Sequence, residues 1–98
     1  MLWYCRFRWQ PGVSADQVRE RVITQHDAGH NQPDKIRGWY NLAGGGAGFM
    51  LIETDEPSEL SDLLQPYMDV VNWDVHAVYE LSYEDTVERF REAVQQTA

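Results

Sequence analysis

The sequence predicts an α+β fold in which helices cover one face of an antiparallel sheet. Alternating apolar residues at positions 2–9 are typical of a strand with one buried face. A glycine tract at positions 44–48 separates two runs of strand-forming residues, and helix-start signals follow the first and third strands. With 98 residues, of which 43% are hydrophobic, the chain is long enough for one packed domain over residues 1–98.

The first strand and the first helix are expected within residues 2–30. One face of the strand carries four apolar side chains, Trp3, Cys5, Phe7 and Trp9. Ser14 and Gln17 have the spacing of a capping box, so a helix is expected to begin after Ser14 and to continue to about His30. Its apolar stripe includes Val18, Val22 and His26.

The glycine tract predicts a hairpin between strands at residues 36–42 and 49–54. Both runs are rich in strand-forming side chains, and glycine accepts the positive φ angles that a tight reversal needs. A phosphate-binding loop is the alternative interpretation of the tract. It is disfavoured because no Lys-Ser or Lys-Thr follows, and because a strand comes next where a helix N-terminus would bind the anion.

The second half of the chain predicts a helix, a strand and a last helix. Acids and a proline at residues 55–58 indicate a helix start, and Pro66 should stop or kink that helix. Alternation over residues 73–81 indicates a fourth strand. Ser82 then caps a helix whose apolar positions are Tyr83, Val87, Phe90 and Val94. The order β-α-β-β-α-β with a C-terminal helix is that of a ferredoxin-like domain.

One face of the predicted sheet has no helix of its own to cover it. On this face we expect the apolar side chains of Tyr4, Trp39 and Val78. Among them we expect the charged or titratable side chains of Arg6, Arg8, Arg37, His76 and Glu80. A face with that much aromatic surface is typical of an interface rather than of a solvated surface. The predicted partner is therefore a second copy, in a homodimer through the sheet face.

Composition and charge disfavour several classes of partner. The net charge of −8 and the pI of about 4.6 produce an acidic field that repels phosphate backbones and anionic lipids, so neither nucleic acid nor a membrane is expected. No apolar run approaches the ~20 residues of a membrane span, and Arg6 and Arg8 interrupt the apolar N-terminal stretch before it could form a signal peptide. The single cysteine, Cys5, fits a reducing cytoplasm.

Several short stretches together resemble a known family. They are Pro11-Gly12 after the first strand and residues 25–29, 36–40 with the glycine tract, 65–68 and 73–75. With them, the chain resembles a bacterial family of short uncharacterised proteins in the dimeric α/β-barrel superfamily. The resemblance implies a ferredoxin-like domain that dimerises into a barrel. Chemistry in that superfamily ranges over cofactor-free monooxygenases, lactone isomerases, polyketide cyclases, haem enzymes and ligand-sensing domains, so the resemblance assigns no catalytic residue.

His26 is the candidate catalytic residue, because it lies within the apolar stripe of the first helix. It could act as a general base or orient a ligand, or it could be a hydrogen-bonded core histidine. His26 and His30 have the spacing of two metal ligands, but the two candidates for a third ligand, Cys5 and His76, lie on opposite sheet faces. No metal and no cofactor are therefore predicted.

Phe7, Tyr40 and Tyr79 are the candidate ligand-binding residues, because they are expected on the helix-facing side of the sheet. The same side chains would also serve a packed core. The expected function is binding of a small, largely apolar or aromatic molecule between helices and sheet, with cofactor-free oxygenase or isomerase chemistry left open. The alternative is a non-catalytic dimeric module for ligand sensing or protein interaction. The sequence does not decide whether the chain is an enzyme.

Overall fold

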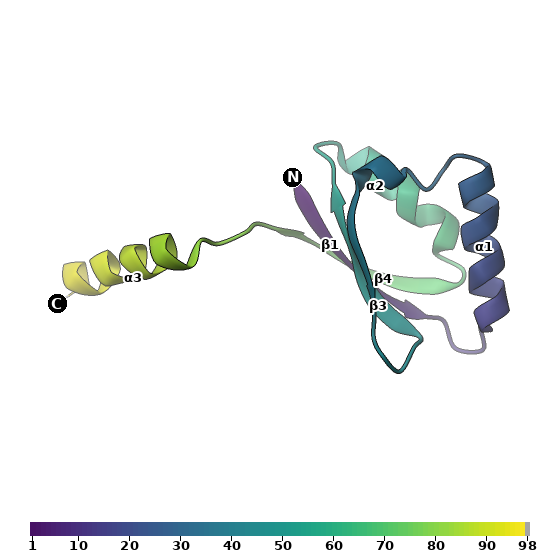
Figure 1. Cartoon of the computed structure of the whole chain (residues 1–98), viewed down its shortest axis with the longest axis horizontal. Coiled ribbons are helices and arrows are strands. Elements are labelled where there is room, and N and C mark those ends of the chain that lie inside the picture. Colours follow the sequence, from purple (N-terminus) through teal and green to yellow (C-terminus); the bar gives the residue numbers. More distant parts are fainter. Residues whose placement is uncertain (98) are drawn as a thin grey trace.

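Four strands form one antiparallel sheet in the computed structural model, which describes residues 1–97 (Figure 1). The elements in chain order are β1 (Leu2–Trp9), α1 (Ala15–Asp27), the 3-10 helix η1 (Pro33–Lys35), β2 (Ile36–Asn41), β3 (Ala47–Glu53), α2 (Pro57–Leu64), the 3-10 helix η2 (Gln65–Tyr67), β4 (Val71–Val78) and α3 (Tyr83–Thr97). The strand order is β2-β3-β1-β4, and α1 and α2 lie on the same face of the sheet (Figure 1). This arrangement confirms the predicted α+β fold with ferredoxin-like strand order and a C-terminal helix.

Local sequence signals explain both ends of α1. The side chain of Ser14 accepts a hydrogen bond from the backbone N–H of Gln17, and the Gln17 side chain accepts one from the backbone N–H of Ser14, so the predicted capping box is confirmed. The helix ends at Asp27, earlier than expected. Gly29 takes a left-handed φ of 77°, and the N–H of His30 bonds the carbonyl of Gln25, which together form a Schellman cap.

The glycine tract forms the β2–β3 hairpin, as predicted. Gly45 and Gly46 carry its positive φ angles of 80° and 77°. Gly48 already belongs to β3, and a Cβ atom there would lie 2.1 Å from the carbonyl oxygen of Tyr40 and 2.7 Å from the ring of Phe7. Glycine at this position therefore allows β2 and the Phe7 ring to approach the β3 backbone closely.

A β-bulge in β2 reverses the sides on which two aromatic residues were expected. The pairing with β3 shifts between Ile36 and Gly38, so that Trp39 pairs with Met50 on the helix-facing side. Tyr40 pairs with Phe49 on the other face and stacks on it, with ring centroids 4.9 Å apart. The predictions of Trp39 on the open face and Tyr40 on the helix-facing side are wrong, because one extra residue in a strand exchanges the faces of all residues beyond it.

The core lies between the sheet and α2. Its nine buried residues are Cys5, Phe7, Met50, Ile52, Leu60, Leu63, Leu64, Val70 and Val71. In contrast, α1 contributes no buried residue, and its Val18 packs against the core only partly buried. Thus α2 is anchored by apolar burial, whereas α1 covers the sheet loosely.

The last helix stands apart from the rest of the chain. β4 ends at Val78 rather than at residue 81, and residues 79–82 lead in an extended path to α3, which stands clear of the sheet and of the other two helices (Figure 1). The described chain is 57 Å long and 17 Å thick, and the projecting helix accounts for the great length. Ser82 caps the helix as predicted, since its side chain accepts a hydrogen bond from the N–H of Asp85. No helix within residues 1–97 has the length and apolar character needed to cross a membrane.

Candidate functional site

An apolar crevice lies between α1, the helix-facing side of the sheet and η2. Four large aromatic side chains line it from the strands: Phe7, Trp9, Trp39 and Trp73. Val18 and Val22 line it from α1, and Asn31 and Tyr67 contribute its polar groups. Its volume is about 80 Å³. Cavities that hold a benzene-sized guest measure roughly 150 Å³, so a ring of that size would enter only if α1 moved outward.

The polar groups of the crevice are already hydrogen-bonded to each other or to the backbone. The Tyr67 hydroxyl donates to Oδ1 of Asn31, and Nδ2 of Asn31 donates to the carbonyl of Val22 at 3.1 Å. Nε1 of Trp73 donates to the carbonyl of Leu64 at 3.1 Å. Burial raises the pKa of the Tyr67 phenol, so it stays protonated at neutral pH. Asn31 thereby connects the end of α1 to η2.

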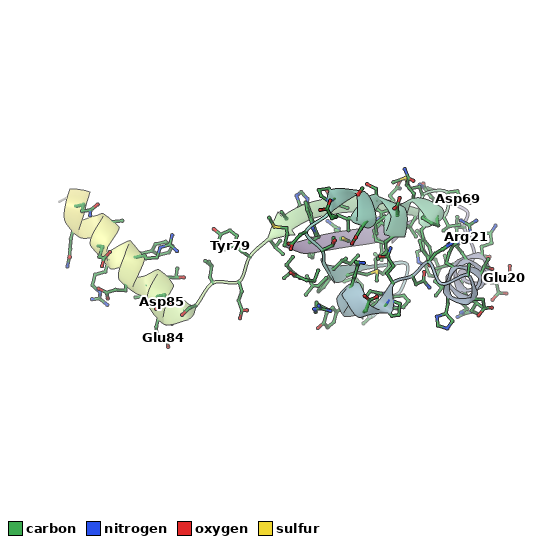
Figure 2. All side chains as sticks on the ribbon, turned by 90° about the horizontal axis from the view of Figure 1, so that it is seen from above. Glu20, Arg21, Asp69, Tyr79, Glu84 and Asp85 are labelled. Atoms are coloured by element: carbon green, nitrogen blue, oxygen red, sulfur yellow. The ribbon has the colours of Figure 1, made fainter. Side chains whose placement is uncertain are left out.

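A second connection holds α1 from outside the crevice. Nη1 and Nη2 of Arg21 donate to the two carboxylate oxygens of Asp69, at 2.5 and 2.8 Å, and Nη1 also donates to the carbonyl of Pro66 (Figure 2). This bidentate bond to Arg21 lowers the pKa of the Asp69 carboxyl. The crevice is therefore bounded by a helix that two polar links, and little apolar burial, hold in place.

His26 does not lie where the sequence predicted. The half-buried side of α1 is formed by Val18, Arg21, Val22 and Gln25. Gln25 belongs to this half-buried side, whereas His26 is exposed and lies outside the crevice. The expected orientation of His26 toward the sheet is wrong, and its catalytic role stays an untested prediction.

The other candidate residues divide between three places. Phe7 lines the crevice, Tyr40 lies on the opposite sheet face, and Tyr79 is 81% exposed beyond the end of β4. The thiol of Cys5 is buried in the core, which raises its pKa to about 11. Within residues 1–97, no three His, Cys, Asp or Glu side chains are grouped closely enough to hold a metal ion.

Sequence reasoning missed the contributions of Asn31, Trp39 and Tyr67 to the crevice. The composition of residues 31–34 is typical of a turn, and it does not indicate which groups the side chain of Asn31 contacts. Strict alternation along the strand places Trp39 on the wrong face, because alternation takes no account of a bulge. Tyr67 has helical spacing with Leu60 and Leu64, which indicates burial but not that its hydroxyl reaches Asn31.

The strand order and the helices on one face define this chain as an α+β protein of ferredoxin-like architecture. The family described as "Domain of unknown function (DUF3303)" matches residues 1–96, and the chain belongs to this family. The predicted resemblance to an uncharacterised family agrees with this result, whereas the dimeric barrel stays a prediction.

The chain is also similar to a solved structure described as "Structure of Rv0793 from Mycobacterium tuberculosis". The two share 17% sequence identity over 83% of this chain and 96% of that chain, with a TM-score of 0.48. No curated protein matches this chain.

Proposed function

We propose that this protein is a non-catalytic, homodimeric binding module that takes a small, uncharged, largely aromatic molecule beneath α1. The single observation that carries the proposal is the lining of the crevice, in which four aromatic side chains from the sheet face two valines from α1. Flat aromatic walls with few polar groups are typical of sites for flat apolar ligands.

The lining also indicates which charge the ligand carries and whether it would react there. No charged side chain, imidazole or thiol of residues 1–97 lines the crevice, so a charged ligand would lose its hydration without gaining a partner. Among the described residues, the crevice lining holds no carboxylate, imidazole, amine or thiol, and burial keeps the Tyr67 phenol protonated, which favours binding over the oxygenase or isomerase chemistry left open by the sequence. Asn31 and Tyr67 could exchange their mutual hydrogen bond for bonds to a hydroxyl or ring N–H of the ligand.

The small volume of the crevice requires α1 to act as a movable cover. Since α1 has no buried residue, moving it outward exposes little apolar surface of the helix itself. Its two links, Arg21 to Asp69 and Asn31 to Tyr67, lie at different points of the helix and of the loop after it. Release of the Asn31 link would let a ring enter between Val22 and Trp39 while the Arg21 link still holds the helix.

The homodimer is proposed from the composition of the open sheet face. Phe49 lies between Tyr4 and Tyr40: its ring is tilted against that of Tyr4, with centroids 5.2 Å apart, and stacked on that of Tyr40, with centroids 4.9 Å apart. Arg6 and Arg8 stand beside this row, and neither makes an ion pair within residues 1–97. Aromatic surface beside unpaired charges is typical of a face that another surface covers. We place the dimer in the cytoplasm, where the free thiol of Cys5 would stay reduced.

Binding of indole and of phenol, followed by calorimetry and by the rise in melting temperature, tests the ligand proposal. Val18→Trp fills the crevice from α1 and is expected to abolish the response to both probes. Its matched control is Ile23→Trp, because Ile23 is on the same helix but 59% exposed. The control should bind like the original protein, and the charged probe benzoate should not bind. The proposal fails if neither indole nor phenol binds the original protein, or if Val18→Trp binds them undiminished.

A further inference from the structure

The segment between β4 and α3 directs the last helix away from its own sheet. Of the residue types that favour chain reversal, residues 79–82 contain only Ser82, whose side chain caps α3, and they form no turn. Tyr79 and Leu81 are 81% and 54% exposed along this segment, and Figure 2 shows Tyr79 just outside the body of the protein and Glu84 and Asp85 well away from it. Return of α3 to its own sheet would need a reversal that these residues do not favour.

The helix nevertheless has the pattern of one that is buried on one side. Tyr83 and Phe90 lie on its apolar stripe and are 78% and 64% exposed, with Val87 between them. An isolated helix of 15 residues is marginal in water, and most helices of this length are stabilised by packing an apolar face. The stripe therefore needs a surface that residues 1–82 of the same copy do not supply.

The open sheet face of a second copy fits this helix in composition, charge and size. The aromatic row of Tyr4 and Phe49 complements the apolar stripe. Glu84 flanks the stripe and has no ion pair within residues 1–97, and Arg6 and Arg8 on the sheet face likewise have none. At about 1.5 Å per residue the helix is roughly 22 Å long, and the eight-residue strands of the sheet are of similar length, roughly 26 Å.

We propose that α3 is an exchanged arm, which packs on the open sheet face of a second copy while the arm of that copy packs on the first. The two contacts are identical, so a two-fold symmetric dimer buries both α3 helices and both open sheet faces. No such surface then remains to bind further copies. Each sheet then lies between α1 and α2 on one face and the partner's α3 on the other. This inference rests on the homodimer of the proposed function, but not on its ligand.

Light scattering on the full chain at micromolar concentration gives the first test. The original protein should have twice the chain mass of 11.4 kDa, and Phe90→Asp should have the mass of one chain. The matched control is Gln96→Asp, which introduces the same acid on the opposite side of α3 and should remain a dimer. Because α3 stands apart from the core, circular dichroism should find the sheet of Phe90→Asp intact. An original protein that is monomeric would overturn both the arm and the homodimer.

Cross-linking separates arm exchange from direct packing of one sheet on another. A Tyr4→Cys chain is mixed with a tagged Phe90→Cys chain and mildly oxidised, and the exchanged arm predicts a disulfide-linked heterodimer. The buried thiol of Cys5 should not compete, and each variant oxidised alone serves as the control. A link between two Tyr4→Cys chains, together with a dimeric Phe90→Asp, would overturn the arm and leave the homodimer standing.

A longer connection tests the same inference through the hinge. Insertion of a short glycine segment after Glu80 would allow the reversal that residues 79–82 disfavour. The insertion variant is expected to become a monomer in which α3 stays helical on its own sheet. If the insertion variant stays a dimer at the same concentration, the straight hinge does not cause exchange and the inference is wrong.

Discussion

Replacement of Gly48 by alanine should severely destabilise the sheet. The new Cβ atom would lie 2.1 Å from the backbone carbonyl oxygen of Tyr40 and 2.7 Å from the ring of Phe7. Cβ atoms in folded proteins essentially never lie within 3.0 Å of an atom to which they are not bonded. Relief of the clash would therefore move β2 away from β3 by roughly 1 Å, and a close-packed interior accommodates such a shift poorly.

The size of the effect follows from the cost of overpacking a core. We expect Gly48→Ala to lower the free energy of unfolding by about 2–3 kcal/mol. For a domain of this length that corresponds to a fall in melting temperature of about 10–20 °C. Calorimetry or circular dichroism measures this fall directly.

Gly44→Ala is the matched control for this experiment. Gly44 lies in the same glycine tract, but a Cβ atom there meets nothing within 4 Å, and its φ is not in the left-handed region. Its melting temperature should stay the same or rise slightly, because alanine restricts the unfolded chain. A Gly48→Ala protein that melts within a few degrees of Gly44→Ala would refute the account of the hairpin, since both substitutions would then act only through the glycine backbone.

Three further predictions concern α1 and the core. Because Arg21 lowers the pKa of Asp69 below its ordinary value of 3.8, their link is complete above that pH and is lost as the pH falls through the folded pKa. In the original protein, protection of the α1 amides against hydrogen exchange should therefore decrease as the pH falls, and Asp69→Asn should remove this part of the pH dependence. If the pH dependence is the same in both proteins, the link does not hold α1. Tyr67→Phe should lower the free energy of unfolding by about 1 kcal/mol and speed amide hydrogen exchange at the end of α1. Exchange as slow as in the original protein would argue against the hydrogen bond to Asn31. With its pKa raised to about 11, Cys5 should resist iodoacetamide at pH 8 until the protein unfolds, and rapid labelling of the native protein would contradict its burial.

The order of the elements could be predicted from the sequence because each boundary has a local cause. The capping box at Ser14, the glycine turn and Pro66 act within a few residues of the boundary that they set. Pro66 stops α2 at Leu64 and begins η2, as its missing N–H predicts. Such signals do not depend on the rest of the fold.

The candidate site could be predicted only in part, because its geometry depends on contacts that are distant in the sequence. The bulge between Ile36 and Gly38 is a property of the pairing with β3, and it moved Tyr40 away from the crevice. His26 lies one position beyond the half-buried stripe of α1, a difference of 100° around a helix that periodicity alone does not resolve. The separation of α3 from the sheet likewise has no local signal apart from the missing turn residues.

The crevice beneath α1 is proposed to accept an uncharged aromatic molecule. Titration of isotope-labelled protein with indole, followed by amide NMR, tests it residue by residue. Saturable shifts are expected at Val18, Val22, Asn31 and Trp73, the residues that surround the crevice from α1, the following loop and β4. No saturable shifts, or shifts confined to Tyr4 and Phe49 on the open sheet face, would contradict it.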